Sequence, residues 1–433
     1  MKEKNFKQNR LCVSLLLCLL MLCGFKGWAQ DFDHISFENK TYIDDIHSIV
    51  LSLPGNQLSK PVIKLNSGDR LNLEFDDLSN ESRYLKYTLI HCTHDWKPDG
   101  LSQMEYLDGF MEDEITEVSY SFNTVTHYTQ YELDFPTQML RITKSGNYIL
   151  FVYDDTPDNP VLTRRFMVLE PMSVGLSGVV KQASDVNDMF TKQEVDFVVR
   201  AGGYDIRNPM MNLHATILQN GRWDNAIYGL RYRSGRPGEF SFDYDNNENA
   251  FNGYSEFKTF DLKSLRSNGN RIVSVGYRRG ENQAYVVEDL ARPFGAYESN
   301  STLKGACYYK NEDFPGENTE DYVNTHFTLR TDFQVRDGDL YVFGGLTDWQ
   351  IKDEAKLKFN ADYNRWETSL FLKQGYYNYH YIYVPKGTRT IDETYIEGSH
   401  WETLNEYTVL IYLQEEGTVY DKLVGVGTFS LRK

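Results

Sequence analysis

Five consecutive residues, His91 to Asp95 (HCTHD), include four side chains that could bind a transition metal. Imidazole, thiolate and carboxylate groups are the usual ligands of zinc, which takes four in a tetrahedron. The apolar alternation around this stretch indicates a strand, in which successive side chains point to opposite faces. Only Cys92 with His94, or His91 with Asp95, can then share a face, so a zinc site would need ligands from elsewhere. We favour inward packing of Cys92 and expect no metal site.

A second stretch, residues 243–248 (DYDNNE), resembles the start of a calcium-binding loop. Such a loop needs glycine at its sixth position and a bidentate glutamate at its twelfth. Glu248 occupies the first of these positions and Tyr254 the second. We therefore interpret the stretch as a polar hairpin loop.

Short signatures that position catalytic groups are missing from the sequence. There is no G-x-S-x-G elbow, Walker A loop, H-E-x-x-H helix or dinucleotide fingerprint. Asp and Glu number 62, but a glycosidase pair is defined by its separation in space, which counting cannot reveal. We predict that the protein is not an enzyme and has no catalytic or cofactor-binding residues.

Strand patterns dominate the chain. Val62, Lys64 and Asn66 alternate with the apolar Ile63 and Leu65, and the same period of two recurs along the sequence. Long helical patterns are scarce, and aromatic residues, which suit half-buried strands, make up 14% of the chain. These features, with frequent turn signals, predict an all-β fold of three consecutive immunoglobulin-like β-sandwich domains after a signal peptide.

Turn signals and composition suggest where the domains divide. We place a signal peptide at residues 1–29, a first sandwich at 30–170, a second with a trailing linker at 171–310, and a third at 311–433. Residues 291–320 are rich in Gly, Ser, Asn and Glu, which is typical of a connector. The boundary between the second and third sandwiches is therefore the least defined.

The amino-terminal residues have the features of a secretory signal. A basic start precedes the apolar run at residues 11–25, which is too short to span a bilayer comfortably. Small residues at Gly27 and Ala29 place the cleavage before Gln30. We expect an exported, soluble, periplasmic protein that does not insert into the membrane.

Four cysteines bear on lipidation and disulfides. Cys18 and Cys23 each follow a leucine, whereas a lipidated bacterial cysteine follows a small residue, so we expect no lipid anchor. Cys92 and Cys307 lie in different predicted domains. A disulfide is permitted in an oxidising compartment, but two buried thiols are the simpler interpretation.

The charge balance is strongly acidic. Without residues 1–29 the chain has 40 Lys and Arg against 61 Asp and Glu, a formal charge of −21. Nucleic acid is excluded as a partner because its binding depends on Lys and Arg that neutralise phosphates. Adhesion to an anionic lipid surface is disfavoured for the same reason.

The stretch from Tyr87 to Pro136 combines several unusual motifs: YTLIHCTHDWKPDG, QMEYLDGFMEDEIT and YSFNTVTHYTQYELDFP. It closely resembles the amino-terminal domain of the type IX secretion system plug protein family of Bacteroidetes. Later motifs extend the resemblance: LYVFGGLTD at 340–348, QGYYNYHY at 374–381 and EGS at 397–399. With the signal sequence, the resemblance covers essentially the whole exported chain.

The third predicted domain is also similar to carbohydrate-binding modules of the starch and glycogen type. In that family two tryptophans and a lysine hold the sugar. Trp349 matches the first tryptophan, but His380 stands at the lysine position and residues 386–388 (KGT) offer no second tryptophan. We take Trp349 and His380 as the positions of a sugar platform whose binding has been lost.

The resemblance to the plug family implies a non-enzymatic periplasmic protein. Members of that family bind and occlude the periplasmic mouth of the type IX translocon, a very large outer-membrane β-barrel. We expect a monomer that associates with the outer membrane through this barrel alone and needs no cofactor. The surface that contacts the translocon and the trigger for release do not follow from the sequence.

Three alternative functions stay open. A carbohydrate-binding protein would be revealed by retained affinity for glucans. An exported cargo or interaction protein is a second alternative, although residues 421–433 show no clear resemblance to a cargo-sorting domain. A hydrolase would require a pocket with converging titratable groups.

Overall fold

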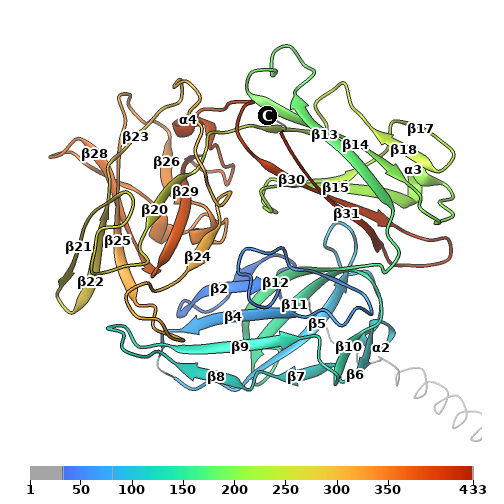
Figure 1. The fold of residues 1–433 in the computed structure, drawn as a ribbon, viewed down its shortest axis with the longest axis horizontal. Helices are drawn as coiled ribbons and strands as arrows, with labels where there is room; N and C mark the ends of the chain where they lie inside the picture. Colours follow the sequence, from blue (N-terminus) through green and yellow to red (C-terminus); the bar gives the residue numbers. More distant parts are fainter. Residues whose placement is uncertain (1–31, 33, 80, 432–433) are drawn as a thin grey trace, which may run out of the picture. The chain divides into compact units, whose positions relative to one another are not determined.

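β-Strands are the main regular structure of the described chain, and its few helices are single turns (Figure 1). The computed structural model describes residue 32 and residues 34–79 and 81–431. The predicted all-β class is confirmed. The signal-peptide prediction for residues 1–29 lies outside the described residues. Residues 37–433 form one compact unit, and the account below concerns that unit.

The first core is a sandwich of two sheets formed by residues 40–169. One sheet has the order β2-β4-β9-β8, and strands β12-β11-β5-β7 lie in the other. Its elements are β1 (Lys40–Thr41), β2 (Ile46–Ser52), β3 (Val62–Lys64), β4 (Leu71–Asp77), β5 (Leu85–Cys92), α2 (Gln103–Tyr106), β6 (Leu107–Gly109), β7 (Glu112–Glu114), β8 (Glu117–Tyr120), β9 (Thr129–Phe135), β10 (Leu140–Ile142), β11 (Gly146–Asp154) and β12 (Pro160–Leu169). Alternate residues of β4, namely Leu71, Leu73 and Phe75, point inward and are fully buried.

The second core packs residues 174–251 against the last strands of the chain. Its sheets have the orders β13-β14-β18-β17 and β16-β15-β30-β31. Its elements are β13 (Gly175–Gln182), β14 (Lys192–Arg200), α3 (Pro209–Asn212), β15 (Leu213–Gln219), β16 (Ile227–Leu230), β17 (Ser234–Arg236), β18 (Glu239–Phe242), β19 (Ala250–Asn252), β30 (Glu406–Leu413) and β31 (Lys422–Ser430).

The third core spans residues 260–396. In the sequence it lies between residues 174–251 and the last strands, β30 and β31, which together form the second core. Strands β21-β22-β25-β28-β27 form one sheet and β20-β29-β24 the other. Its elements are β20 (Lys258–Asp261), β21 (Ile272–Arg278), β22 (Glu281–Val286), β23 (Asp289–Leu290), β24 (Cys307–Tyr309), β25 (Tyr322–Arg330), β26 (Gly338–Phe343), η1 (Gly345–Thr347), η2 (Asp353–Ala355), β27 (Lys358–Asn360), β28 (Arg365–Lys373), β29 (Gly375–Pro385) and α4 (Thr394–Glu397).

The packing does not follow the predicted division into residues 171–310 and 311–433. Strand β30 runs antiparallel to β15 from the pair Leu213–Leu413 to the pair Gln219–Tyr407, and in Figure 1 the red carboxy-terminal strands lie beside the green β15. Strands β20 to β23, which the sequence assigned to the second sandwich, pack in the third core. The third core is thus inserted into the second, because β15 and β16 need β30 and β31 to complete their sheet.

The first and second cores share one ten-stranded sheet. Strands β12 and β31 meet in a parallel pair at Leu169 and Leu423, which links β11 and β5 on one side to β30 and β15 on the other. Within the described residues no helix is long and apolar enough to cross a bilayer. Cys92 is buried, Cys307 is half-buried, and both are free thiols.

Candidate functional site

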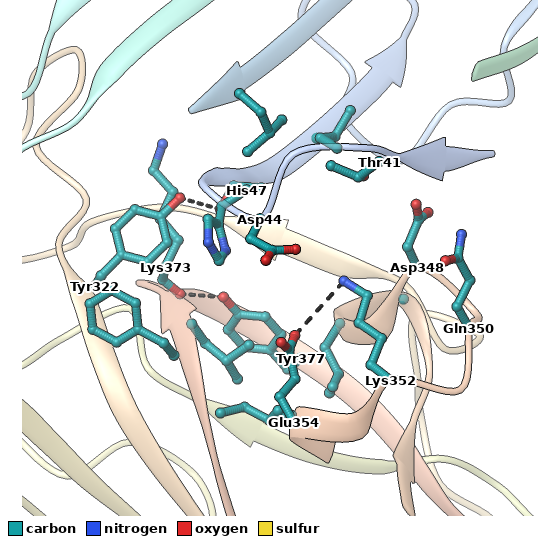
Figure 2. Close-up of a pocket in the computed structure, with 18 of the residues that line it drawn as sticks. Thr41, Asp44, His47, Tyr322, Asp348, Gln350, Lys352, Glu354, Lys373 and Tyr377 are labelled. Carbon is teal, nitrogen blue, oxygen red and sulfur yellow. Dashed lines mark hydrogen bonds and ion pairs between the residues drawn. The ribbon is translucent and has the colours of Figure 1, made fainter. Parts of the chain in front are cut away.

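A pocket of about 750 Å³ lies where the first and third cores meet (Figure 2). The segment from Thr41 to Ile49, which leads into β2, supplies one wall. The opposite wall comes from the 3-10 turns η1 and η2 and from strands β25 and β28. Residues far apart in the sequence, such as Asp44 and Lys352, therefore line the same cavity.

A buried ion pair lies behind this pocket and joins the two cores. The Nζ atom of Lys373, at the end of β28, is 2.7 Å from Oδ2 of Asp76 on β4. The two residues are only 4% and 1% exposed. The Tyr322 hydroxyl donates to the same Asp76 oxygen at 2.6 Å and is 2.7 Å from Oγ of Ser48. The charge of Lys373 is thus neutralised and hydrogen-bonded, as burial requires.

The hydroxyl group of Ser48 in this pocket is not paired with a base that could activate it. The hydroxyl group of Ser48 pairs with the phenol of Tyr322, whose pKa is raised well above its usual value by burial and by Asp76. A phenol with a raised pKa is not a base that could take the serine proton at neutral pH. Burial, and then the nearby Lys352, lower the pKa of His47. The arrangement is suited to holding two cores together.

A second buried ion pair connects the second core to the third. Arg222, in the turn after β15, lies 2.7 Å from Oε1 of Glu393 and 2.6 Å from Oδ2 of Asp224. Glu393 also pairs with Nδ1 of His380 at 3.0 Å. Burial alone would raise the pKa of Glu393, but Arg222 and His380 outweigh it and lower the pKa to about 2. Glu393 therefore stays ionised between two cores.

The two sugar-platform positions both lie at this second junction. The His380 ring is 0% exposed and stacks on Phe257 at a centroid distance of 4.0 Å. The Arg222 guanidinium lies 4.4 Å above the Trp349 ring, and that ring packs so closely on Gly305 that a Cβ atom there would clash with it. Both side chains thus serve packing between cores. The prediction that they bind no sugar stays a prediction.

The histidine-rich stretch HCTHD divides between two sets of partners. His91 bonds to Asp99 through Nδ1 and to the carbonyl oxygen of Ser145 through Nε2, at 2.9 Å for the latter. His94 instead pairs with Asp421, 3.0 Å away, in the loop before β31. His91 thus pairs eight residues further along the chain, and His94 pairs with a residue near the carboxy terminus. One of these contacts joins the first core to the second.

Aromatic and cationic side chains reinforce the junction between the first and second cores. Trp96 and Trp223 meet edge to face at a centroid distance of 4.9 Å. The guanidinium of Arg165, on β12, lies 4.5 Å above Trp96 and 5.2 Å above Trp223. Such cation–π contacts strengthen when the ring and the cation are desolvated. All three pairs of cores are thus joined by charged side chains.

Comparison with known proteins identifies the amino-terminal part of this assembly. Residues 46–170 match the type 9 secretion system plug protein 1st domain. This match confirms the predicted resemblance over that stretch, which coincides with the first core. The plug-family domain indicates a role related to type 9 secretion and a location with the secretion system.

A solved structure supports the fold over most of the chain. A crystal structure of a hypothetical protein from Parabacteroides merdae ATCC 43184 is 28% identical, covers 92% of this chain and 100% of its own, and superimposes with a TM-score of 0.85. The C-terminal domain of the Streptococcus pyogenes antigen I/II-family protein AspA is 8% identical over 88% of this chain and 99% of its own, with a TM-score of 0.15 that carries no argument. No curated protein matches the chain significantly.

Sequence reasoning missed the residues that join the plug-family domain to the other cores. Asp76 follows the alternating strand 71–75, and Lys373 ends the apolar stretch 370–372. A charged residue that continues an apolar strand is a signal for a buried ion pair. Its partner cannot be inferred from local spacing, because Asp76 and Lys373 lie on different cores.

Proposed function

We propose that this protein is a non-enzymatic plug that binds and occludes the periplasmic mouth of the type 9 secretion translocon barrel. The observation that carries the proposal is the match of residues 46–170 to the plug protein 1st domain. The partner is an outer-membrane protein, and the plug reaches the membrane through it as a periplasmic monomer without a cofactor.

Buried contacts between the cores support this assignment. A body that occludes a wide opening must resist deformation, and residues 37–433 form one compact unit. The ion pairs Asp76–Lys373 and Arg222–Glu393 are buried between cores. Each pair ties its two cores in one arrangement, because a buried charge left without its partner costs about 3–5 kcal/mol.

The acidic charge suits a reversible contact. The full sequence has a formal charge of −17, and removal of the predicted signal would make the charge more negative. Charged surfaces favour fast, specific and salt-sensitive association over very tight binding. Exposed charge pairs are screened over about 8 Å at physiological ionic strength. Plug and barrel should therefore separate more readily as salt increases.

Copurification from the outer membrane tests the proposal. The full chain with an affinity tag is expressed in its native host, and the membrane is extracted in mild detergent. The translocon barrel should copurify at low salt and dissociate progressively as salt rises. A tagged periplasmic protein of similar charge is the control. Absence of the barrel from the plug eluate at every salt concentration would contradict the proposal.

A further inference from the structure

A second pocket, of about 1040 Å³, lies where the second and third cores meet. Asp188, Thr191 and Lys192, at the start of β14, line one side of it. The other side comes from residues 291–295 and 332–333 and from the single turn of α4. The apolar residues of its lining are Ala291, Pro293, Phe294, Phe333 and Tyr395. Side chains that anchor a protein complex fill pockets of this kind.

Phe294 lies at the rim of this pocket with its side chain almost entirely in solvent. It is 99% exposed. Val186 and Phe190, in the loop that leads to β14 on the other side of the pocket, are 77% and 67% exposed. Single exposed apolar residues are ordinary, but here three of them lie on the two loops that line one apolar pocket. Such a concentration of exposed apolar side chains marks an interaction surface.

Backbone hydrogen bonds hold both loops in place. The amide of Arg292 donates to the carbonyl oxygen of Ile396 at 2.8 Å, and the amide of Gly295 donates to that of Arg292 at 3.1 Å. On the other side of the pocket, the Trp401 amide donates to the carbonyl oxygen of Phe190 at 3.2 Å. The surface is thus formed before a partner arrives, which reduces the entropy lost on binding.

The charges around the pocket indicate the chemistry of the occupant. Lys192 and Arg292 are the cations of its lining, and each already has a carboxylate of the protein as its partner. Asp332 and Asp392 also line the pocket, and within the described residues neither has an ion-pair partner. Two carboxylates therefore lie without a cation beside an apolar surface. A segment with Lys or Arg next to a large apolar side chain complements both features.

We propose that this pocket, with Phe294 at its rim, receives a segment of the translocon barrel in which Lys or Arg flanks a large apolar side chain. The inference rests on the proposed plug function and names the surface that meets the barrel. A second copy of this chain fits less well, because each copy has a formal charge of −17 and the copies repel each other. The partner contacts the second and third cores at once.

Titration of detergent-solubilised barrel onto the immobilised full exported chain tests the inference. The barrel is taken from a strain that lacks this chain. Phe294→Ser should weaken binding by about 30-fold, as expected when an aromatic anchor is removed. Its melting temperature should equal that of the wild type, because the side chain is exposed. Phe359→Ser is the matched control: Phe359 is an exposed phenylalanine of the third core, on β27 outside the pocket, and this variant should bind like the wild type.

A second pair of variants separates local charge from net charge. Asp332→Lys and Asp362→Lys change the net charge of the chain equally. Asp362 is exposed and lies in the turn between β27 and β28, outside the pocket. Because a like charge opposite the basic segment is repulsive, Asp332→Lys should weaken binding by about tenfold or more. Asp362→Lys should leave the affinity for the barrel close to that of the wild type.

The outcomes distinguish this inference from the plug function. If the wild type binds the barrel and Phe294→Ser or Asp332→Lys binds equally well, the inference is wrong and the plug function stands. If the wild type does not bind the barrel at any salt concentration, the plug function is wrong and the inference is wrong with it. Light scattering provides a further check. A wild-type dimer that Phe294→Ser dissociates would assign the pocket to a second copy of this chain and overturn the inference.

Discussion

The two ion pairs that fasten the third core to its neighbours differ in how their charges are shared. Lys373 pairs with Asp76 and has its other contact with the ring of Tyr128, 4.5 Å away. Arg222 pairs with both Glu393 and Asp224 and lies above the Trp349 ring. The first junction thus depends on a single acid, whereas the second has an alternative partner for its cation.

This difference shows that burial alone does not determine how much stability is lost when one charged residue of a junction is replaced. Loss of Lys373 leaves Asp76 in a buried site with the Tyr322 hydroxyl as its hydrogen-bond donor. Loss of Glu393 leaves Arg222 with Asp224, whose side chain is 19% exposed. Removing one partner of a buried pair is most damaging where no other group can take the charge. We therefore expect unequal effects from similar substitutions at the two junctions.

The largest effect is expected from Lys373→Met, which keeps the length of the side chain and removes its charge. Asp76 is then buried without a cation, and the free energy of unfolding should fall by about 3–5 kcal/mol. Urea denaturation, monitored by fluorescence, measures this change in the free energy of unfolding. Lys60→Met is the control, because the ion pair of Lys60 with Glu406 is partly exposed and should contribute at most about 1 kcal/mol. Equal losses in the two variants would contradict the account.

A smaller effect, dependent on pH, is expected from Glu393. Its pKa is lowered from an ordinary value near 4.5 to about 2, so the unfolded chain binds the proton first as pH falls. The stabilisation is complete above pH 4.5 and is lost as pH falls toward 2, by up to roughly 3 kcal/mol. Unfolding curves of the wild type and Glu393→Gln should therefore converge across this range.

Glu354→Gln is the matched control for the acid series, because Glu354 is an exposed glutamate. Its unfolding free energy should differ from that of the wild type by at most about 1 kcal/mol at each pH, as expected for an exposed ion pair. If the difference between the wild type and Glu393→Gln is constant over this range, the ion pair with Arg222 does not hold Glu393 ionised.

Of the three interactions, the contact of the Trp349 ring with Arg222 should stabilise the fold least, because this ring is half-buried. Its contact with Arg222 should contribute about 1–2 kcal/mol as a partly desolvated cation–π interaction. Isothermal titration with soluble glucans should show no heat beyond dilution for the wild type. Saturable glucan binding that Trp349→Ala abolishes would instead assign a sugar site to this junction.

The strands could be predicted from the sequence, but which distant strands and charged residues pair with one another could not. The alternation of Leu71, Leu73 and Phe75 identifies β4, since side-chain direction in a strand is a local property. The partner of β15 is β30, almost two hundred residues later, and periodicity does not encode which strands pair. The same holds for Asp76 and Lys373, whose charges are recognisable one by one but whose pairing requires the packed cores.

The central claim, that this protein closes a wide secretion pore, is tested most directly by outer-membrane permeability. Entry of a large antibiotic that the membrane normally excludes is measured in a deletion strain, with and without the complementing chain, and in a strain that also lacks the barrel. The account predicts that deletion admits the antibiotic, that complementation restores exclusion, and that loss of the barrel removes the leak. Unchanged exclusion after deletion, in a strain that retains the barrel, would contradict it.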